Sequence, residues 1–277
     1  MITRLLTDHM GVEVIGVDLT TPLNDETRSE LIDAFHRHLV LVIRNQNLDP
    51  QQMLGAVGIF GEVFDQHNKL FSIPDCPQIH YLSNEDHYPD GNRYIPGGGY
   101  HTDHSNALQP PKATILFAKH LPETGGDTQF FNMYSAYADL PDTMKLWIAN
   151  MKAEHVYQSR YSARKLMALS DASAKNAPDA VVHPLVRTHP ETGRKALYIN
   201  PIRIEAIEGL SEPEMLSLLD ELMEHATQEK YQYRHQWKLG DLVMWDNRCL
   251  LHKANGDYDM SQLRYLYRVM LKGDRPI

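Results

Sequence analysis

The feature that most constrains the fold of this chain is where its β-strand patterns fall. Apolar runs rich in β-branched residues occur early, at 12–18 and 39–43, and return in the last third, at 231–237, 241–245 and 264–271. Helical periodicity lies between these runs but does not alternate with them regularly. Consecutive βαβ units are therefore not expected, and a doubly wound parallel sheet is disfavoured.

Two further strands are predicted in the middle of the chain, at 113–118 and 127–131, with Gly125-Gly126 as the turn between them. Together the patterns favour a mostly β protein, an antiparallel sandwich or jelly roll decorated with helices. The length of 277 residues suits one large β-rich domain, and no internal repeat is visible. We therefore expect a single domain over residues 1–277.

Helices are predicted from residue 22 to about Arg37, from Asp49 to about Phe60, over 133–151 and over 211–227. The last of these begins with a capping box, in which Ser211 is the N-cap and Glu214 is its partner. Gly240-Asp241 predicts a hairpin turn into the apolar strand that follows it. The segment 83–99 is rich in Asn, Asp, Pro and Gly, so it is expected to be a long loop of functional importance.

Charge and cysteine content narrow the partners and the compartment. The formal net charge is −9 and no run of Lys or Arg forms a basic stripe, so nucleic acid is not expected as a partner. An anionic ligand would need a local basic pocket. With two cysteines, Cys76 and Cys249, a disulfide framework is not expected. The sequence shows neither a signal peptide nor an apolar stretch that could span a bilayer, so we expect a cytoplasmic protein without membrane association.

The strongest chemical signal is His101-Thr102-Asp103, directly after a run of glycines. In a strand, residues two apart point to the same face, so this imidazole and carboxylate could reach one metal ion. His252, just after an apolar strand, is the candidate for a third ligand. Two histidines and a carboxylate form the facial triad that holds non-haem Fe(II) and leaves coordination positions open. Each histidine alone is as well explained by an ordinary surface position.

Two arginines and one hydroxyl suggest a carboxylate near this metal. Arg264 and Arg268 lie an even number of residues apart in the last strand, so both face one side of it. A guanidinium that points into a barrel needs an anion, and its fork matches a carboxylate. Thr128 follows Gly125-Gly126-Asp127 at the start of a strand, where its hydroxyl could share that carboxylate.

The sequence resembles the taurine dioxygenase / 2,4-dichlorophenoxyacetate dioxygenase family of Fe(II)- and 2-oxoglutarate-dependent oxygenases. The resemblance covers nearly the whole chain, and several motifs occur in the family's order. They are Gly11 to Leu19, His101-Thr102-Asp103, Gly125 to Thr128, His189-Pro190-Glu191-Thr192-Gly193-Arg194, Gly240 to His252, and Arg268.

The resemblance implies a double-stranded β-helix (jelly roll) with helical decoration. It implies that His101, Asp103 and His252 bind Fe(II), and that Arg268 and Thr128 hold the distal carboxylate of 2-oxoglutarate. Arg264 would touch the co-substrate or the substrate carboxylate. O₂ is consumed, and succinate and CO₂ are released. Asp103 at the ligand position favours hydroxylation over halogenation.

The substrate is less constrained. Candidate pocket residues lie beside the iron motif and in two later segments: Tyr100, His104, Ser105, Asn106, Arg160, Tyr161 and Arg203. For Arg160 and Arg203, the more ordinary explanation is a charged side chain exposed to solvent in a loop. The C-terminal block from Tyr233 to His252 looks closer to phenoxyacetate-type members than to taurine-type ones. We therefore predict hydroxylation of a small anionic organic acid, such as an aryloxyalkanoate-like carboxylate.

Two alternatives stay open. One is a sulfonate or sulfate-ester oxygenase of the taurine dioxygenase type, which would release sulfite or sulfate. The other is a non-catalytic metal-binding β-helix protein, against which Thr128 and Arg268 argue, since such a protein has no reason to direct them at the metal. A zinc hydrolase is disfavoured because no carboxylate is placed as a general base. The resemblance leaves a homo-oligomer open.

Overall fold

The largest element of the computed structural model is an eight-stranded sheet; the structure describes residues 1–66, 69–87, 90–163 and 179–277. Neighbouring strands in this sheet are antiparallel except for β2 and β3, which are parallel. In spatial order the strands are β1 (Ile2–Leu5), β2 (Val12–Ile15), β3 (Val40–Ile43), β14 (Leu242–Asp246), β6 (Ala113–His120), β16 (Tyr265–Leu271), β5 (Cys76–Ser83) and β4 (Ser72–Ile73).

A second, three-stranded sheet packs against the centre of the first. It consists of β13 (Gln232–His235), β7 (Thr128–Asn132) and β15 (Leu250–Ala254), in that order. The ring centroids of Phe130 in β7 and Trp245 in β14 lie 5.3 Å apart, so the two sheets meet through their apolar faces. Leu116 and Leu266 of the large sheet belong to the same buried cluster. Two antiparallel layers around one core form the jelly roll that was predicted.

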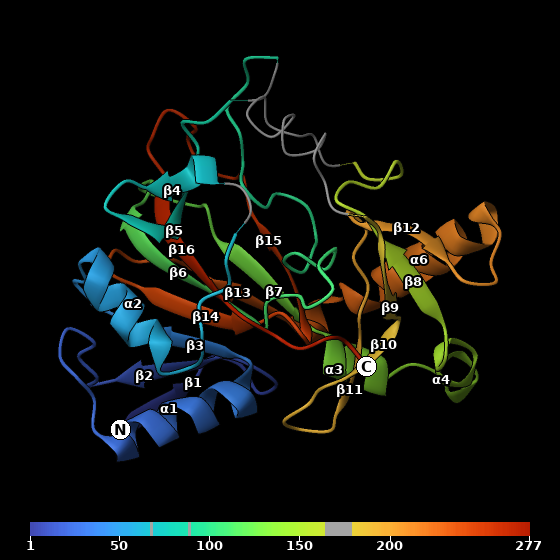
Figure 1. Ribbon diagram of the computed structural model, residues 1–277, viewed down its shortest axis with the longest axis horizontal. Coiled ribbons are helices and arrows are strands. Elements are labelled where there is room, and N and C mark those ends of the chain that lie inside the picture. The colour runs from blue at the N-terminus through green and yellow to red at the C-terminus, as the bar shows by residue number, and fades with distance from the viewer. Residues whose placement is uncertain (67–68, 88–89, 164–178) are drawn as a thin grey trace.

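Two helices cover the other face of the large sheet (Figure 1). They are α1 (Asp25–His38) and α2 (Pro50–Gly58), and their buried side chains form a second cluster with the outward-facing residues of β6, β14 and β16. Alternation along β6 is the reason that two clusters exist: Leu116 faces the inner core, whereas Ile115 and Phe117 face the helices. Asn24 caps α1, and Asp49 makes a capping box with Gln52 at the start of α2.

The remaining elements lie beyond one end of the two facing sheets (Figure 1). Among the described residues they comprise two small sheets and three α-helices; two 3₁₀ turns are also described. Their bounds are α3 (Met133–Ala138), α4 (Asp142–Ile148), β8 (Lys152–His155), β9 (Val181–Pro184), β10 (Val186–Thr188), β11 (Lys195–Leu197), β12 (Ile204–Ile207), α6 (Glu212–Ala226), η1 (Lys69–Phe71) and η3 (Glu229–Tyr231). α6 has the predicted capping box of Ser211 and Glu214.

Several sequence predictions need correction. The helix expected over 133–151 is two helices, because Pro141 lacks an N–H and interrupts the backbone hydrogen bonds. The strand predicted over 12–18 is β2, and it ends at Ile15 rather than at residue 18. The segment 64–99, in which no strand was predicted, contains β4 and β5, while its part after Ser83 has no named strand or helix among the described residues. The strands β8 to β12, which lie between 152 and 207, were also missed.

The turn at Gly240-Asp241 is not a hairpin. It connects β13 to β14, which lie in different sheets, so the chain crosses from one layer to the other at this point. Gly240 has a φ of +76°, and a Cβ on it would lie 2.6 Å from the carbonyl oxygen of Gln46. Only glycine fits here, since both the backbone angle and the space exclude a side chain.

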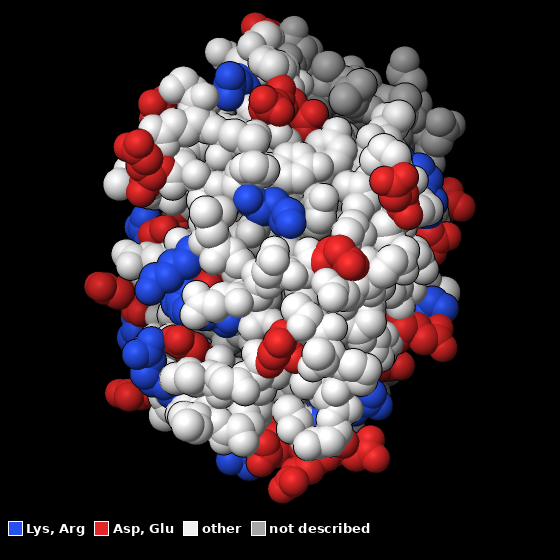
Figure 2. Space-filling model, turned by 90° about the vertical axis from the view of Figure 1, so that its left-hand side faces the viewer, with Lys and Arg blue, Asp and Glu red and all other residues white. Residues whose placement is uncertain are grey.

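The surface is mixed in charge. On the face drawn in Figure 2, Lys and Arg side chains are interspersed with Asp and Glu. Recognition of an anion therefore depends on individual arginines rather than on a broad positive field. Among the described residues, no helix combines the length and the hydropathy that crossing a membrane requires.

Candidate metal centre

The two histidines of the predicted triad are brought together by backbone pairing. His101 donates its N–H to the carbonyl of His252 at 3.0 Å, and His252 donates its N–H to the carbonyl of His101 at 2.9 Å. Directly opposed residues of an antiparallel pair project to the same side. The two imidazole rings accordingly lie with their centroids 4.2 Å apart. His252 lies within β15, not after a strand as its sequence context predicted.

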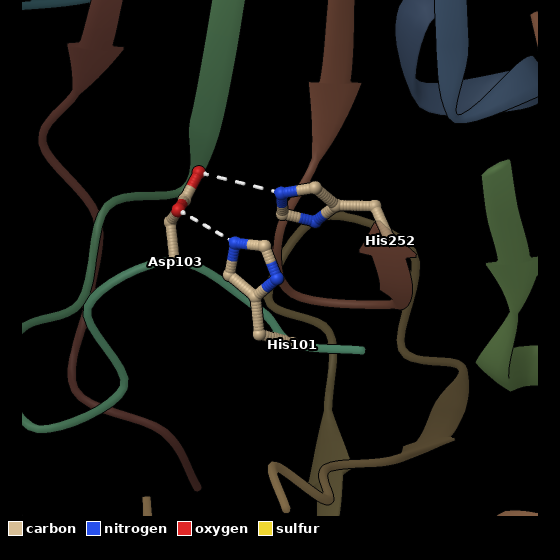
Figure 3. A group of neighbouring side chains, drawn as sticks. All are labelled: His101, Asp103 and His252. Carbon is tan, nitrogen blue, oxygen red and sulfur yellow. Dashed lines mark ion pairs between the residues drawn. The ribbon is translucent and has the colours of Figure 1, made fainter. Parts of the chain in front are cut away.

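Asp103 completes the group (Figure 3). Its Oδ1 lies 3.6 Å from Nε2 of His101, and its Oδ2 lies 3.8 Å from Nε2 of His252. One ligand atom from each of the three residues lies within 4.8 Å of the others. The segment of His101 is a single bridge followed by a turn, not the strand that was predicted, yet Thr102 still points the other way and donates to the carbonyl of Asn247.

The protonation states suit a metal site. Burial, together with the neighbouring His101, lowers the pKa of His252 to about 3, so the imidazole is neutral at physiological pH. Burial alone would raise the pKa of Asp103, but the contact with His101 and the charge of Arg268 hold the pKa of this carboxyl well below its usual range. Nδ1 of His101 lies 2.8 Å from the carbonyl of Gly99, which leaves Nε2 directed at the group. A neutral imidazole and an ionised carboxylate are the forms that bind a metal.

A second group of potential ligands, His189, Asp246 and Cys249, is already satisfied by protein contacts. Both oxygens of Asp246 accept hydrogen bonds from Arg248, and Oδ2 also lies 3.0 Å from Nε2 of His189. Burial raises the pKa of the Cys249 thiol well above its usual range. A metal ion would have to displace the arginine, so this cluster is a buried ion-pair network and the triad is the candidate metal centre.

Arg264 lies against the turn that precedes Thr128. Its Nε donates to the carbonyl of Gly126 at 3.0 Å, while its Nη2 is buried and has no hydrogen-bond partner among the described residues. Burial lowers the pKa of this guanidinium to about 10. The Thr128 hydroxyl accepts from Nε1 of Trp237 at 3.0 Å, which leaves its own proton free to be donated. Arg264 and Thr128 thus offer unused donors from neighbouring segments.

Arg268 lies nearer the triad, and the charge of Asp103 acts on it. Its Nη2 donates to Oε1 of Gln66 at 2.5 Å. His80 of β5 is directly opposite Arg268 and is also buried, and its pKa falls to about 4 because of burial and of the adjacent guanidinium. Arg268 Nε, Gln66 Nε2 and His80 Nε2 have no hydrogen-bond partner within the described part of the chain. Buried polar groups of this kind call for a ligand or water.

The predicted substrate residues fall into two sets. Tyr100 and His104 are partly buried, and Ser105 and Asn106 are buried. The hydroxyl of Ser105 accepts from Nδ2 of Asn200 at 2.9 Å, so that residue is engaged inside the protein. The second set, Arg160, Tyr161 and Arg203, lies in later segments.

Arg160 pairs with Glu205 at 2.8 Å and its side chain is 68% exposed, which fits the solvated-charge interpretation. Tyr161 lies beneath the guanidinium of Arg160, with 4.9 Å between that group and the ring centroid. Arg203 is buried, unlike the exposed arginine that composition alone would predict, and its Nη1 donates to the carbonyl of Tyr157 at 2.6 Å.

Sequence reasoning missed Gln66, His80, Thr114 and Asn247, all of which lie at or behind the triad. A signal existed for His80, since it lies two residues from Leu82 and therefore on the same face of β5, but the strand itself was not recognised. Thr114 donates to Oδ2 of Asp103, a contact that depends on how β6 and the turn meet. Nothing in the local sequence indicates such a contact.

The buried neutral histidines predict how stability depends on pH. Burial depresses the pKa of His252 to about 3 and those of His80 and His183 to about 4, whereas each titrates near 6.5 in an unfolded chain. Between these values the unfolded state binds more protons, so stability is complete above about pH 6.5 and is lost as the pH falls. The melting temperature of the metal-free protein should fall from pH 7 to pH 5. His183→Gln should make that fall shallower; a flat profile would contradict the assignment of neutral histidines.

Comparison with known proteins bears on this site. The family described as taurine catabolism dioxygenase TauD, TfdA matches residues 3–270. The chain is 37% identical, over 85% of its length and 82% of the relative's, to an alpha-ketoglutarate-dependent 2,4-dichlorophenoxyacetate dioxygenase of Burkholderia sp. (strain RASC). It is 31% identical, over 97% and 88%, to an alpha-ketoglutarate-dependent sulfate ester dioxygenase of Pseudomonas putida. The structure of AAD-2 with Mn(II) and N-oxalylglycine matches with a TM-score of 0.82 at 32% identity, covering 99% of this chain and 98% of that one.

Proposed function

This chain belongs to the taurine catabolism dioxygenase TauD, TfdA family, and we propose that within it the chain hydroxylates a small organic carboxylate at an iron held by His101, Asp103 and His252. It is an Fe(II)- and 2-oxoglutarate-dependent dioxygenase. The substrates of the family are small organic anions, and O₂ is the co-substrate. The open question is which anion this chain selects and which residues hold it.

The donor set supports the iron assignment. The imidazoles of His101 and His252 and the ionised carboxylate of Asp103 converge from the bridge and the turn, and two imidazoles with one carboxylate are the ligand set that suits Fe(II) of this enzyme class. When bound, the iron supplies the oxidative chemistry in which 2-oxoglutarate becomes succinate and CO₂ while the substrate is hydroxylated. The chain itself orients both organic molecules and limits access of water. Gly97 lies close to the triad, because a Cβ on it would lie 3.3 Å from Cε1 of His101.

For the distal carboxylate of 2-oxoglutarate we propose Arg264 with Thr128. The sequence assigned this role to Arg268 with Thr128, but Arg264 is the arginine that contacts Gly126, two residues before that threonine. Its buried, unpartnered Nη2 and the free proton of the Thr128 hydroxyl supply two donors. A buried guanidinium without a counter-ion is costly, and a carboxylate compensates for its charge.

For the substrate we propose Arg268, with Gln66 and His80 beside it. The observation that carries this proposal is the set of three buried, unpartnered nitrogen atoms, one on each residue. Arg268 supplies the positive charge. His80 is neutral because its pKa is about 4, so it adds no second positive charge beside the guanidinium. An anionic head group bound here would keep the rest of the substrate beside the triad, because Arg268 lies close enough for Asp103 to act on it.

A sulfonate or sulfate ester is the second candidate, because the three donors also suit a tetrahedral anion and one relative is named a sulfate ester dioxygenase. The carboxylate is preferred since the guanidinium fork matches its planar geometry. Identity is also higher to the relative named for a phenoxyacetate.

The test is 2-oxoglutarate consumption in the presence of Fe(II) and O₂, with succinate as the measured product. The panel of candidate substrates is a phenoxyacetate, an alkanesulfonate and an alkyl sulfate. With the phenoxyacetate, the amount of succinate formed should equal the amount of hydroxylated carboxylate. Release of sulfite or sulfate with the other two probes would favour the second candidate. A protein that binds Fe(II) but forms no succinate would leave only the interpretation as a metal-binding β-helix.

A further inference from the structure

A buried chain of hydrogen bonds lies behind the carboxylate of Asp103. The hydroxyl of Thr114 donates to Oδ2 of Asp103 at 2.5 Å. Thr114 is on β6 in the same alternation as Leu116, so it faces the inner core, and it is completely buried. Oδ2 is therefore engaged by a protein group and also lies 3.8 Å from Nε2 of His252, whereas Oδ1 lies 3.6 Å from Nε2 of His101 (Figure 3).

The direction of this hydrogen bond follows from the groups behind it. Nε1 of Trp245 donates to Oδ1 of Asn247 at 3.0 Å, and Nδ2 of Asn247 donates to the Thr114 hydroxyl at 2.8 Å. An indole N–H can only donate, so the amide oxygen must face Trp245 and the amide nitrogen must face Thr114. A hydroxyl that accepts from an amide has its one proton left for another acceptor. That acceptor is Asp103, and the proton direction is fixed over four residues.

Asn247 also connects the segments that carry the other ligands. Its carbonyl accepts from the Thr102 hydroxyl at 2.7 Å, between the two ligand residues of the turn. The Trp245 ring lies 4.8 Å from the ring of His252. One asparagine at the end of β14 thus holds the turn of Asp103 and supports the residue that packs on His252.

We propose that Thr114, oriented by Asn247, is a positioning residue that restricts Asp103 to binding the metal through Oδ1 alone. This inference rests on the proposed metal centre. A carboxylate with both oxygens free can chelate a metal and fill two coordination positions. The hydrogen bond at Oδ2 opposes that mode, which keeps a position available for the co-substrate or O₂ and holds the carboxylate in one rotamer.

The test measures the Kd for Mn(II) in the absence of co-substrate. The concentration of free Mn(II) is determined from its electron paramagnetic resonance signal. Thr114→Val and Thr114→Ala should raise the Kd for Mn(II) by about 10- to 100-fold, and Thr114→Ser should stay within about 3-fold of the wild type. The serine and alanine variants both lack the γ-methyl group, so their difference reports the hydroxyl alone. The absorption of bound Co(II) should change in Thr114→Ala and not in Thr114→Ser, since it reports the coordination number.

Thr227→Val is the matched control, because its hydroxyl donates to the carbonyl of Met223 at 2.7 Å outside the barrel. It should bind Mn(II) as the wild type does. Equal Kd values for Thr114→Ser and Thr114→Ala, with normal binding by the wild type, would overturn the positioning role and leave the metal centre intact. The metal centre, and this inference with it, would be overturned if the wild-type protein failed to bind Mn(II) or bound it with the same Kd as His101→Ala.

Discussion

His101→Ala is expected to lower kcat/KM by on the order of 10³ or more, which corresponds to at least ~4 kcal/mol of transition-state stabilisation. The variant removes one of three protein ligands, and the remaining His252 and Asp103 cannot hold the ion in one geometry. The side chain is partly exposed and its backbone bridge to His252 does not depend on the imidazole, so the fold should persist. Turnover as succinate release and Fe(II) binding should fall together.

The matched control is His120→Ala. His120 is an exposed histidine at the end of β6, and it contacts Tyr265 on the side of the sheet away from the triad. It should retain wild-type metal binding and turnover. If His101→Ala bound Fe(II) and turned over at the rate of this control, the metal centre would have to be sought elsewhere in the chain.

Arg264→Met is expected to weaken co-substrate binding by about 30- to 1000-fold, or ~2–4 kcal/mol, since it removes the buried charge that meets a carboxylate. Methionine retains an unbranched chain of similar reach, so packing against Gly126 is largely conserved. N-oxalylglycine, the ligand in the structure of AAD-2, is a suitable probe that does not turn over. Its Kd should be measured in the presence of Mn(II).

Arg268→Met provides the comparison, because the two arginines lie on the same face of the same segment. It should leave the Kd for N-oxalylglycine within a few-fold of the wild type and instead raise the substrate KM. The reverse outcome, in which Arg268→Met abolishes binding of N-oxalylglycine and Arg264→Met does not, would restore the assignment that the sequence suggested.

Much of the site could be predicted from the sequence because its ligands sit in local motifs. His101 and Asp103 are two residues apart, and the order of the motifs along the sequence indicated the family. The proposed division of roles between the arginines could not be predicted in this way. Alternation says that Arg264 and Arg268 share a face, but only the packing of the Gly126 turn against one of them separates their environments.

The supporting residues Thr114, Trp245 and Asn247 could not be predicted from the sequence for a related reason. Thr114 and Trp245 are directly opposed in the pairing of β6 with β14, and Asn247 follows β14. Their hydrogen bonds depend on strand register, which no local pattern in the sequence fixes. β5 was missed because its strand pattern is interrupted by polar residues, and one of these, His80, is buried opposite Arg268.

The bridge between residues 101 and 252 determines when, during synthesis, an iron site can exist. When only the first half of the chain has emerged from the ribosome, His101 and Asp103 are present but the third candidate ligand, His252, is not. β15 must emerge and pair before the imidazoles meet, so metal loading is a late event in the life of the nascent polypeptide.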